Sequence, residues 1–223
     1  MRTINLEELL EFYDYRVEGS IGHASAINAV LGEDLAVALF LNYSIANALD
    51  PKVLSTKCNP GTKKGKRLDR WISTTDKVKK TVHYQTEIKN WSAHAIGGLE
   101  APRVDLNDEK MIAYRMNRWE RQFDDQRKQL RQEPAKKVLE RMLPIDKNAE
   151  VRPLIIFWDS MHPSGEAEEF FRVDIKDAAF KHLWVFSMST HVRKLIDRGV
   201  EEIPVDLPAA VNRIEWLEKI YSH

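Results

Sequence analysis

The chain has 223 residues, of which 43% are apolar and 30% are charged, and its formal net charge is zero. This length and this balance are those of a globular protein with a core of its own, and they exclude a disordered or fibrous chain. A single cysteine, Cys58, excludes an intrachain disulfide, and the neutral net charge argues against a protein that wraps nucleic acid over a wide surface.

The first fifty residues predict two helices. Residues 6–13 indicate a short helix, and residues 22–49, which are rich in alanine and leucine and apolar nearly all round, indicate a long buried helix. The first fourteen residues hold Arg2 and then four acidic side chains, which is not the layout of a signal peptide, and acidic residues interrupt the most apolar stretch. We therefore expect a cytoplasmic protein with no membrane span.

Two predicted strands follow a basic loop. Residues 67–72 and 82–89 alternate as strands do, so that Leu68 and Ile72 share one face of the first strand and Asp69 lies on the other. The loop before them and the turn between them are rich in basic side chains, which we expect to contact nucleic-acid phosphates. These side chains are Lys57, Lys63, Lys64, Lys66, Arg67, Lys79 and Lys80.

The second half of the chain predicts a charged helix over 107–131, strands over 154–158, 170–175 and 183–187, and helices over 190–198 and 209–221. Together these elements predict one mixed α/β domain spanning residues 1–223. In this interpretation the strand at 82–89 lies near the middle of a central sheet. The helix at 24–49 covers one face of that sheet, and the C-terminal helices cover the other face.

A catalytic function is indicated by Asp69 together with the tripeptide Glu87-Ile88-Lys89. Residues two apart in a strand share a face, so Glu87 and Lys89 point the same way, and pairing of the two strands would bring Asp69 beside them. Two carboxylates suit a hard divalent cation such as Mg²⁺ or Mn²⁺, and a neighbouring lysine can position a water. These are the components that hydrolysis of a phosphodiester needs.

These residues resemble the PD-(D/E)xK nuclease superfamily, which has a restriction-endonuclease-like fold. Leu68-Asp69 and Glu87-Ile88-Lys89 look like its two core strand motifs, with leucine in the place of proline. Glu33 looks like the acidic residue that many members carry on the preceding helix. The resemblance covers roughly residues 22–98, which would be the catalytic core, while residues 107–223 complete the sheet and the helices.

The resemblance implies an α/β fold with a central mixed sheet flanked by helices, and Mg²⁺-dependent endonucleolytic cleavage of DNA. Asp69, Glu87 and Lys89 would be catalytic, the metal ligands would include Glu33 and the carbonyl of Ile88, and Gln85 would lie near the site. A homodimer is expected, because cutting a duplex needs one active site per strand. The alternatives are cleavage of RNA, and a non-catalytic nucleic-acid-binding or protein-interaction module on the same fold.

Structural explanations for the same residues stay open. Glu87 and Lys89 could form an exposed ion pair across a half-solvated sheet, and Asp69 could pair with Arg67 or Arg70. On the helix, Asp34 could be the inward-facing carboxylate in place of its neighbour Glu33. Four further side chains that could suggest a serine hydrolase lack the glycine-flanked nucleophile elbow. These are Ser187, Ser189, His191 and Asp197.

Overall fold

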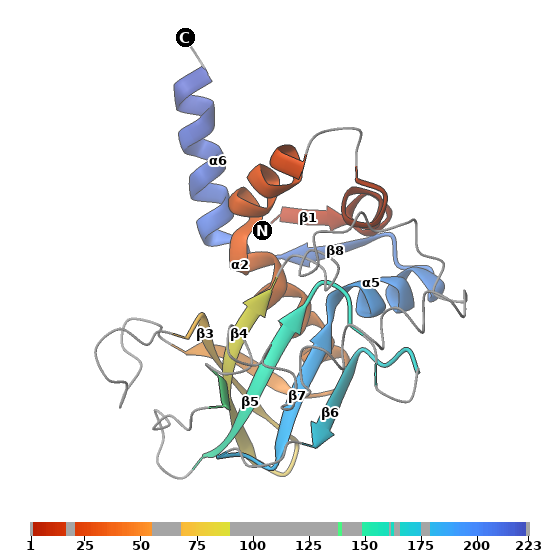
Figure 1. The fold of residues 1–223 in the computed structure, drawn as a ribbon, viewed down its shortest axis with the longest axis vertical. Helices are drawn as coiled ribbons and strands as arrows, with labels where there is room; N and C mark the ends of the chain where they lie inside the picture. The colour runs from red at the N-terminus through yellow and green to blue at the C-terminus, as the bar shows by residue number, and fades with distance from the viewer. Residues whose placement is uncertain are drawn as a thin grey trace.

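The computed structural model describes residues 2–16, 21–54, 68–89, 138–139, 149–160, 162, 166–174 and 179–221 (Figure 1). The predicted helix at 107–131, the basic loop at 57–67 and Cys58 lie outside these residues. No helix in the described parts of the chain is long and apolar enough to span a membrane.

Six strands form one mixed sheet in the order β2-β3-β4-β5-β7-β6. Their bounds are Asp50–Leu54 (β2), Arg70–Thr75 (β3), Thr81–Lys89 (β4), Glu150–Phe157 (β5), Phe170–Asp174 (β6) and His182–Ser187 (β7). Strands β2, β3 and β4 are antiparallel, β5 is parallel to both β4 and β7, and β6 is antiparallel to β7. The strand with the E-x-K tripeptide is therefore internal, as the sequence predicts.

The β3–β4 hairpin closes on the turn after Thr75. The carboxylate of Asp76 accepts hydrogen bonds from the backbone N–H groups of Val78 (3.0 Å) and Lys80 (2.9 Å), and Lys79 adopts a positive φ of 64°. At the other end β3 begins at Arg70, later than expected. The prediction that Leu68 shares a face with Ile72 is wrong: Leu68 packs in the cluster of Trp71, because the chain bends at Asp69 and the two-residue alternation stops there.

Several helical segments in the described part of the chain accompany the sheet. Their bounds are Leu6–Leu10 (α1), Glu11–Arg16 (η1, a π-helical turn), Ile21–Ala46 (α2), Met188–Asp197 (α5) and Pro208–Tyr221 (α6). The long helix expected over 22–49 is present as α2, but Gly32 interrupts it with φ 60° and ψ −152°. That conformation is open almost only to glycine. Glu33 and Asp34 follow the break, in the first turn of the second part of α2, where the helix dipole favours acidic side chains.

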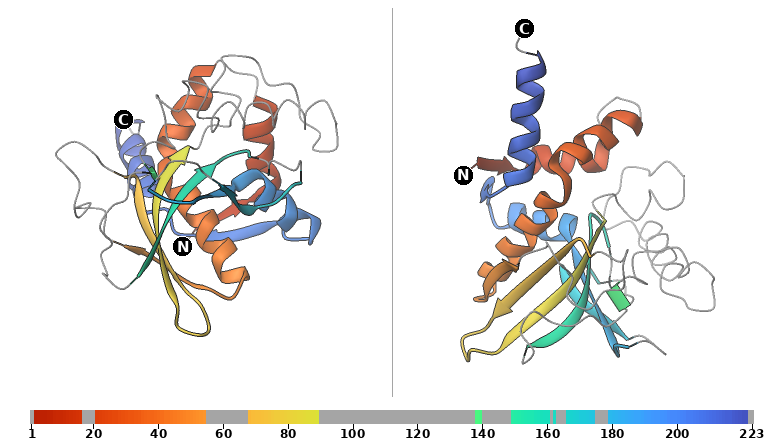
Figure 2. Two further views of the ribbon diagram at one scale, coloured as in Figure 1. Left: turned by 60° about the horizontal axis from the view of Figure 1, so that its bottom comes forward. Right: turned by 90° about the vertical axis from the view of Figure 1, so that its left-hand side faces the viewer.

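The main core lies between α2 and one face of the sheet. Phe40 of α2 meets the rings of Tyr84 and Phe186 edge to face, and Met188 and Val192 of α5 belong to the same cluster. The prediction that the C-terminal helices cover the opposite face is wrong, because the apolar residues of α5 pack on the α2 side and α6 packs against α2 (Figure 2). The opposite face carries a smaller cluster. Its buried residues are Leu68, Trp71, Val138, Ile155, Phe157, Phe171, Leu183 and Val185.

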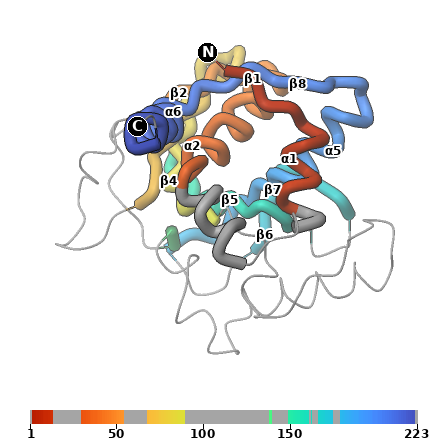
Figure 3. The backbone as a smooth tube through the Cα atoms, turned by 90° about the horizontal axis from the view of Figure 1, so that it is seen from above, coloured from red at the N-terminus to blue at the C-terminus, as the bar shows by residue number. Residues whose placement is uncertain are grey.

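Two short strands that the sequence does not predict join the ends of the chain. Strand β1 (Arg2–Asn5) pairs antiparallel with β8 (Glu202–Val205), so that Ile4 lies opposite Ile203. The ribbon lies beside the helices rather than in the main sheet (Figure 3). It leads into α6, which projects from the rest of the protein with Trp216, Ile220 and Tyr221 exposed (Figure 1).

Candidate active site

Glu87 and Lys89 lie near the end of β4, on the face that carries the smaller cluster. Their partners on β5 are Ile155 and Phe157. The Lys89 ammonium is 3.1 Å from Oε1 of Glu87, and the side chain of Glu87 is 1% exposed while that of Lys89 is 20% exposed. Burying a carboxylate is costly unless a cation or hydrogen bonds compensate it. The burial excludes the explanation of this pair as an exposed surface ion pair.

Asp69 contacts the backbone of the same tripeptide. Its Oδ2 accepts a hydrogen bond from the N–H of Ile88 at 2.8 Å. Extending the register from the Arg70–Thr86 pair by one step places Asp69 opposite Glu87. The Asp69 carboxylate thus occupies the position that a backbone carbonyl would take if β3 continued. Arg70 contacts the main-chain carbonyl of Asp69 (2.7 Å) rather than its carboxylate.

The carbonyl of Ile88 faces the Asp69 side of β4. In a strand, the N–H and the C=O of one residue point to the same neighbouring strand, and the next residue points to the other. The N–H of Ile88 points to Asp69, and the carbonyl of Lys89 accepts from Trp158 at 3.1 Å, on the β5 side. Asp69 and this carbonyl therefore offer oxygen atoms at one end of β4, next to Glu87.

Glu33 and Asp34 hold the guanidinium of Arg70 on the opposite face of the sheet. Arg70 Nη1 is 2.5 Å from Oε2 of Glu33, and Nη2 is 3.5 Å from Oδ1 of Asp34. Asp34 is the buried member of the two, at 7% exposed against 40% for Glu33. Its Oδ2 accepts from the N–H groups of Ala209 (2.6 Å) and Ala210 (3.1 Å), which caps α6 from a distant part of the chain. Asp34 is thus the inward carboxylate.

Glu33 does not join Asp69 and Glu87 in a three-carboxylate cluster. Within the described ranges, one trio of acidic, histidine or cysteine side chains brings its ligand atoms within 4.8 Å of one another, and that trio lies elsewhere. That Glu33 binds a metal ion therefore stays a prediction.

Gln85 is on the predicted face and is fully buried. It lies opposite Trp71, and its Nε2 donates to the carbonyl of Val138. This bond joins β4 to Val138, which belongs to the smaller cluster. The place of Gln85 in the active site, two residues before Glu87, stays a prediction.

The two predicted phosphate-binding lysines within the described residues lie at the far end of the hairpin. Glu87 lies seven positions after Lys80, roughly 23 Å away at the usual rise per residue. Lys80 pairs with Glu150 at 2.9 Å, and Lys79 is exposed. The other five basic residues lie outside the described part of the chain.

A buried polar network surrounds His191 of α5. Its Nδ1 donates to Oε2 of Glu169 (2.6 Å), and its Nε2 is 3.0 Å from Oδ1 of Asn42. Burial alone would raise the pKa of Glu169. The hydrogen bond from His191, the charge of His191 and the charge of Lys194 outweigh the effect of burial, so that the pKa of Glu169 is lowered. Ser189 donates instead to Asp159 (2.9 Å). The imidazole therefore does not activate this serine, which agrees with the missing hydrolase elbow.

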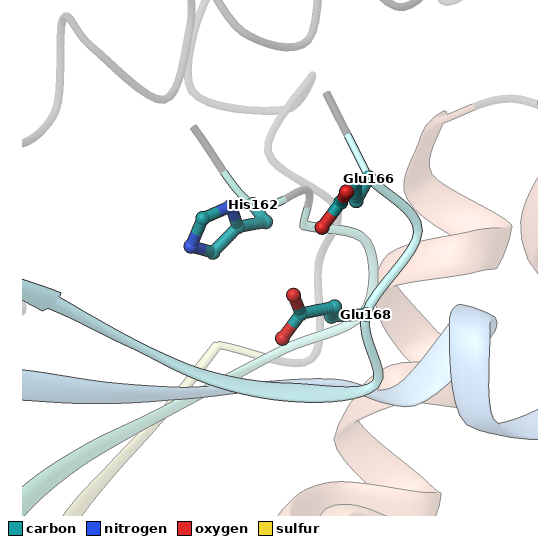
Figure 4. A group of neighbouring side chains, drawn as sticks. All are labelled: His162, Glu166 and Glu168. Atoms are coloured by element: carbon teal, nitrogen blue, oxygen red, sulfur yellow. The ribbon is translucent and has the colours of Figure 1, made fainter. Parts of the chain in front are cut away.

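The trio that meets within 4.8 Å consists of His162, Glu166 and Glu168, between β5 and β6. Figure 4 shows their side chains converging on one space. This group is not among the residues predicted from the sequence. The His-x-x-x-Glu-x-Glu spacing in a loop between two predicted strands is the signal that could have found it.

No protein-family model, no curated protein and no solved structure matches this chain. What the chain does is therefore inferred from its own residues.

Proposed function

We propose that this protein is a Mg²⁺-dependent nuclease that hydrolyses phosphodiester bonds of DNA, with its active site where β3 begins and β4 ends. One observation carries the proposal. The Asp69 carboxylate is hydrogen-bonded to the middle residue of the E-x-K tripeptide, and that tripeptide holds a buried carboxylate beside an ammonium group. If Glu87 served only to keep the protein soluble, its carboxylate would be exposed to water.

The donor set suits a hard cation. Asp69, Glu87 and the carbonyl of Ile88 would hold it, and Mg²⁺ keeps several waters when only a few protein oxygens bind it. The ion would neutralise charge on the phosphate and acidify a bound water. Lys89 is more exposed than Glu87, so the phosphate approaches from the lysine side. There the ammonium would orient the attacking water and stabilise the developing negative charge.

The order of elements supports a place in the PD-(D/E)xK superfamily, with its restriction-endonuclease-like fold. An acidic pair on α2 precedes the sheet, Asp69 stands immediately before β3, and the E-x-K tripeptide ends β4, the next strand of the same hairpin. This is the order on which the resemblance rests. A duplex would be cut by two copies of the chain related by a twofold axis.

Nicking of supercoiled plasmid tests the proposal. The wild type should relax the plasmid in Mg²⁺ or Mn²⁺ and not in EDTA. Asp69→Asn, Glu87→Gln and Lys89→Met should each lower the rate at least a hundredfold, as loss of a charge-stabilising group does. Glu150→Gln is the matched control, because Glu150 also pairs with a lysine, Lys80, which lies just before β4 at the far end of the hairpin. It should cut at the wild-type rate.

Two results would separate the alternatives. Binding of DNA with no cutting in either cation would favour a non-catalytic module on the same fold. Cutting of single-stranded RNA in place of plasmid, with the same dependence on Asp69 and Lys89, would keep the site and change the substrate.

A further inference from the structure

His162, Glu166 and Glu168 form a group with the composition of a transition-metal site. One ligand atom from each lies within 4.8 Å of the other two. In Figure 4 the imidazole approaches from one side and the two carboxylates from the other, and all three end on the same space. Their chemistry differs from that of the site at β4, which offers oxygen atoms only.

The separation of the three ligand atoms is close to what one ion requires. Zinc bonds to imidazole nitrogen and carboxylate oxygen are about 2.0–2.2 Å long, so two ligand atoms of one ion are at most about 4.3 Å apart. The separations here are within 4.8 Å, so the largest exceeds that limit by at most roughly half an ångström. Rotation of the Glu166 side chain, which is exposed, can close the difference.

The histidine is held in place by a ring contact outside the trio and by backbone hydrogen bonds within it. Its ring meets Phe171 of β6 edge to face, with the ring centres 5.3 Å apart, and Phe171 is 3% exposed. Its backbone N–H donates to the carbonyl of Glu166 (3.3 Å), and the N–H of Glu168 donates to the same carbonyl (3.0 Å). A ligand whose ring is fixed by packing loses little freedom when it binds an ion.

We infer that His162, Glu166 and Glu168 bind a first-row transition-metal ion, with Zn²⁺ as the ion tested, at a site separate from the proposed Mg²⁺ site. An imidazole with two carboxylates favours Zn²⁺ over Mg²⁺, because nitrogen is a good ligand for zinc and a poor one for magnesium. Three protein ligands on a partly exposed loop leave a coordination position for water. The ion joins the loop to the start of β6.

Calorimetric titration of the full-length protein with Zn²⁺ tests the site, and the absorption of bound Co²⁺ reports its geometry. His162→Phe keeps an aromatic ring against Phe171 and removes the nitrogen ligands, and Glu168→Gln keeps the size of the side chain. Each should weaken Zn²⁺ binding at least tenfold and remove the Co²⁺ bands, with unchanged circular dichroism. His182→Ala is the matched control, because His182 pairs with one carboxylate, Asp174. It should bind as the wild type does.

A double variant distinguishes the zinc site from the proposed nuclease site. The Asp69→Asn, Glu87→Gln double variant should lose DNA cleavage and still bind Zn²⁺ at full affinity. The inference is overturned if the wild type shows no saturable Zn²⁺ binding, or if His162→Phe and Glu168→Gln both bind as tightly as the wild type does. Neither result bears on cleavage in Mg²⁺.

Discussion

Replacing Lys89 by methionine removes an ammonium that faces a buried carboxylate. Breaking a buried ion pair from one side costs about 3–5 kcal/mol, whereas an exposed pair contributes about 0.2–1 kcal/mol. Glu87 is 1% exposed, but Lys89 is 20% exposed, so water partly screens the pair. We therefore expect Lys89→Met to lower the free energy of unfolding by about 3 kcal/mol, at the lower end of the buried range. For a chain of this size the melting temperature should fall by roughly 6–12 °C.

Urea unfolding followed by tryptophan fluorescence measures this loss, since Trp71 and Trp158 are fully buried. Lys52→Met is the matched control: Lys52 pairs with Asp50 at 3.3 Å, but both side chains are more than 60% exposed. Its cost should stay well under about 1 kcal/mol. Adding Glu87→Gln to Lys89→Met should recover most of the loss, because the uncompensated charge is then gone. If Lys89→Met costs no more than Lys52→Met, the carboxylate of Glu87 is not buried as described.

Three further expectations concern stability. Asp34→Ala should cost about 2 kcal/mol in urea unfolding, because α6 loses its cap and Arg70 loses a partner, and Asp34→Asn should cost about half as much since the amide oxygen still accepts. Gly32→Ala should cost about 1–3 kcal/mol in the same assay, because alanine is strained at φ 60°, while the end of the Arg213 side chain can move away from the added Cβ; a neutral result would contradict the break in α2. The pKa of Glu169 is lowered from 4.5, so its stabilisation is present above that pH and is lost as the pH falls through the lowered value. Glu169→Gln should therefore reduce stability near neutral pH and flatten its decline in acid, and parallel pH curves would refute this.

The elements that the sequence predicts well are those with strong local patterns. Strands β4 and β7 and helix α6 begin and end within a residue or so of the expectation, because apolar periodicity and turn residues mark them locally. Strands β1 and β8 are four residues each and pair across almost the whole chain. No local pattern encodes such a pairing. The side on which α5 and α6 pack also depends on distant contacts, such as the cap that Asp34 places on α6.

The candidate site likewise has features that the sequence predicts and features that it does not. The shared face of Glu87 and Lys89 follows from the two-residue period of a strand, which holds for any register. The hydrogen bond from Ile88 to Asp69 depends on the register of β3 against β4 and on the bend before β3, and periodicity cannot give either. Glu33 and Asp34 are adjacent in the sequence, and only the position of Arg70 and of the first turn of α6 decides which of them is buried.

The strands at the two edges of the main sheet restrict how copies of this protein can associate. β2 carries Pro51, which has no N–H to donate, and Lys52, while β6 carries the exposed side chains of Arg172 and Asp174. Proline and charge on an edge strand oppose the addition of a strand from another molecule. The sheet is therefore protected against continuation from one molecule into the next, and a twofold pair would have to form through helices or loops.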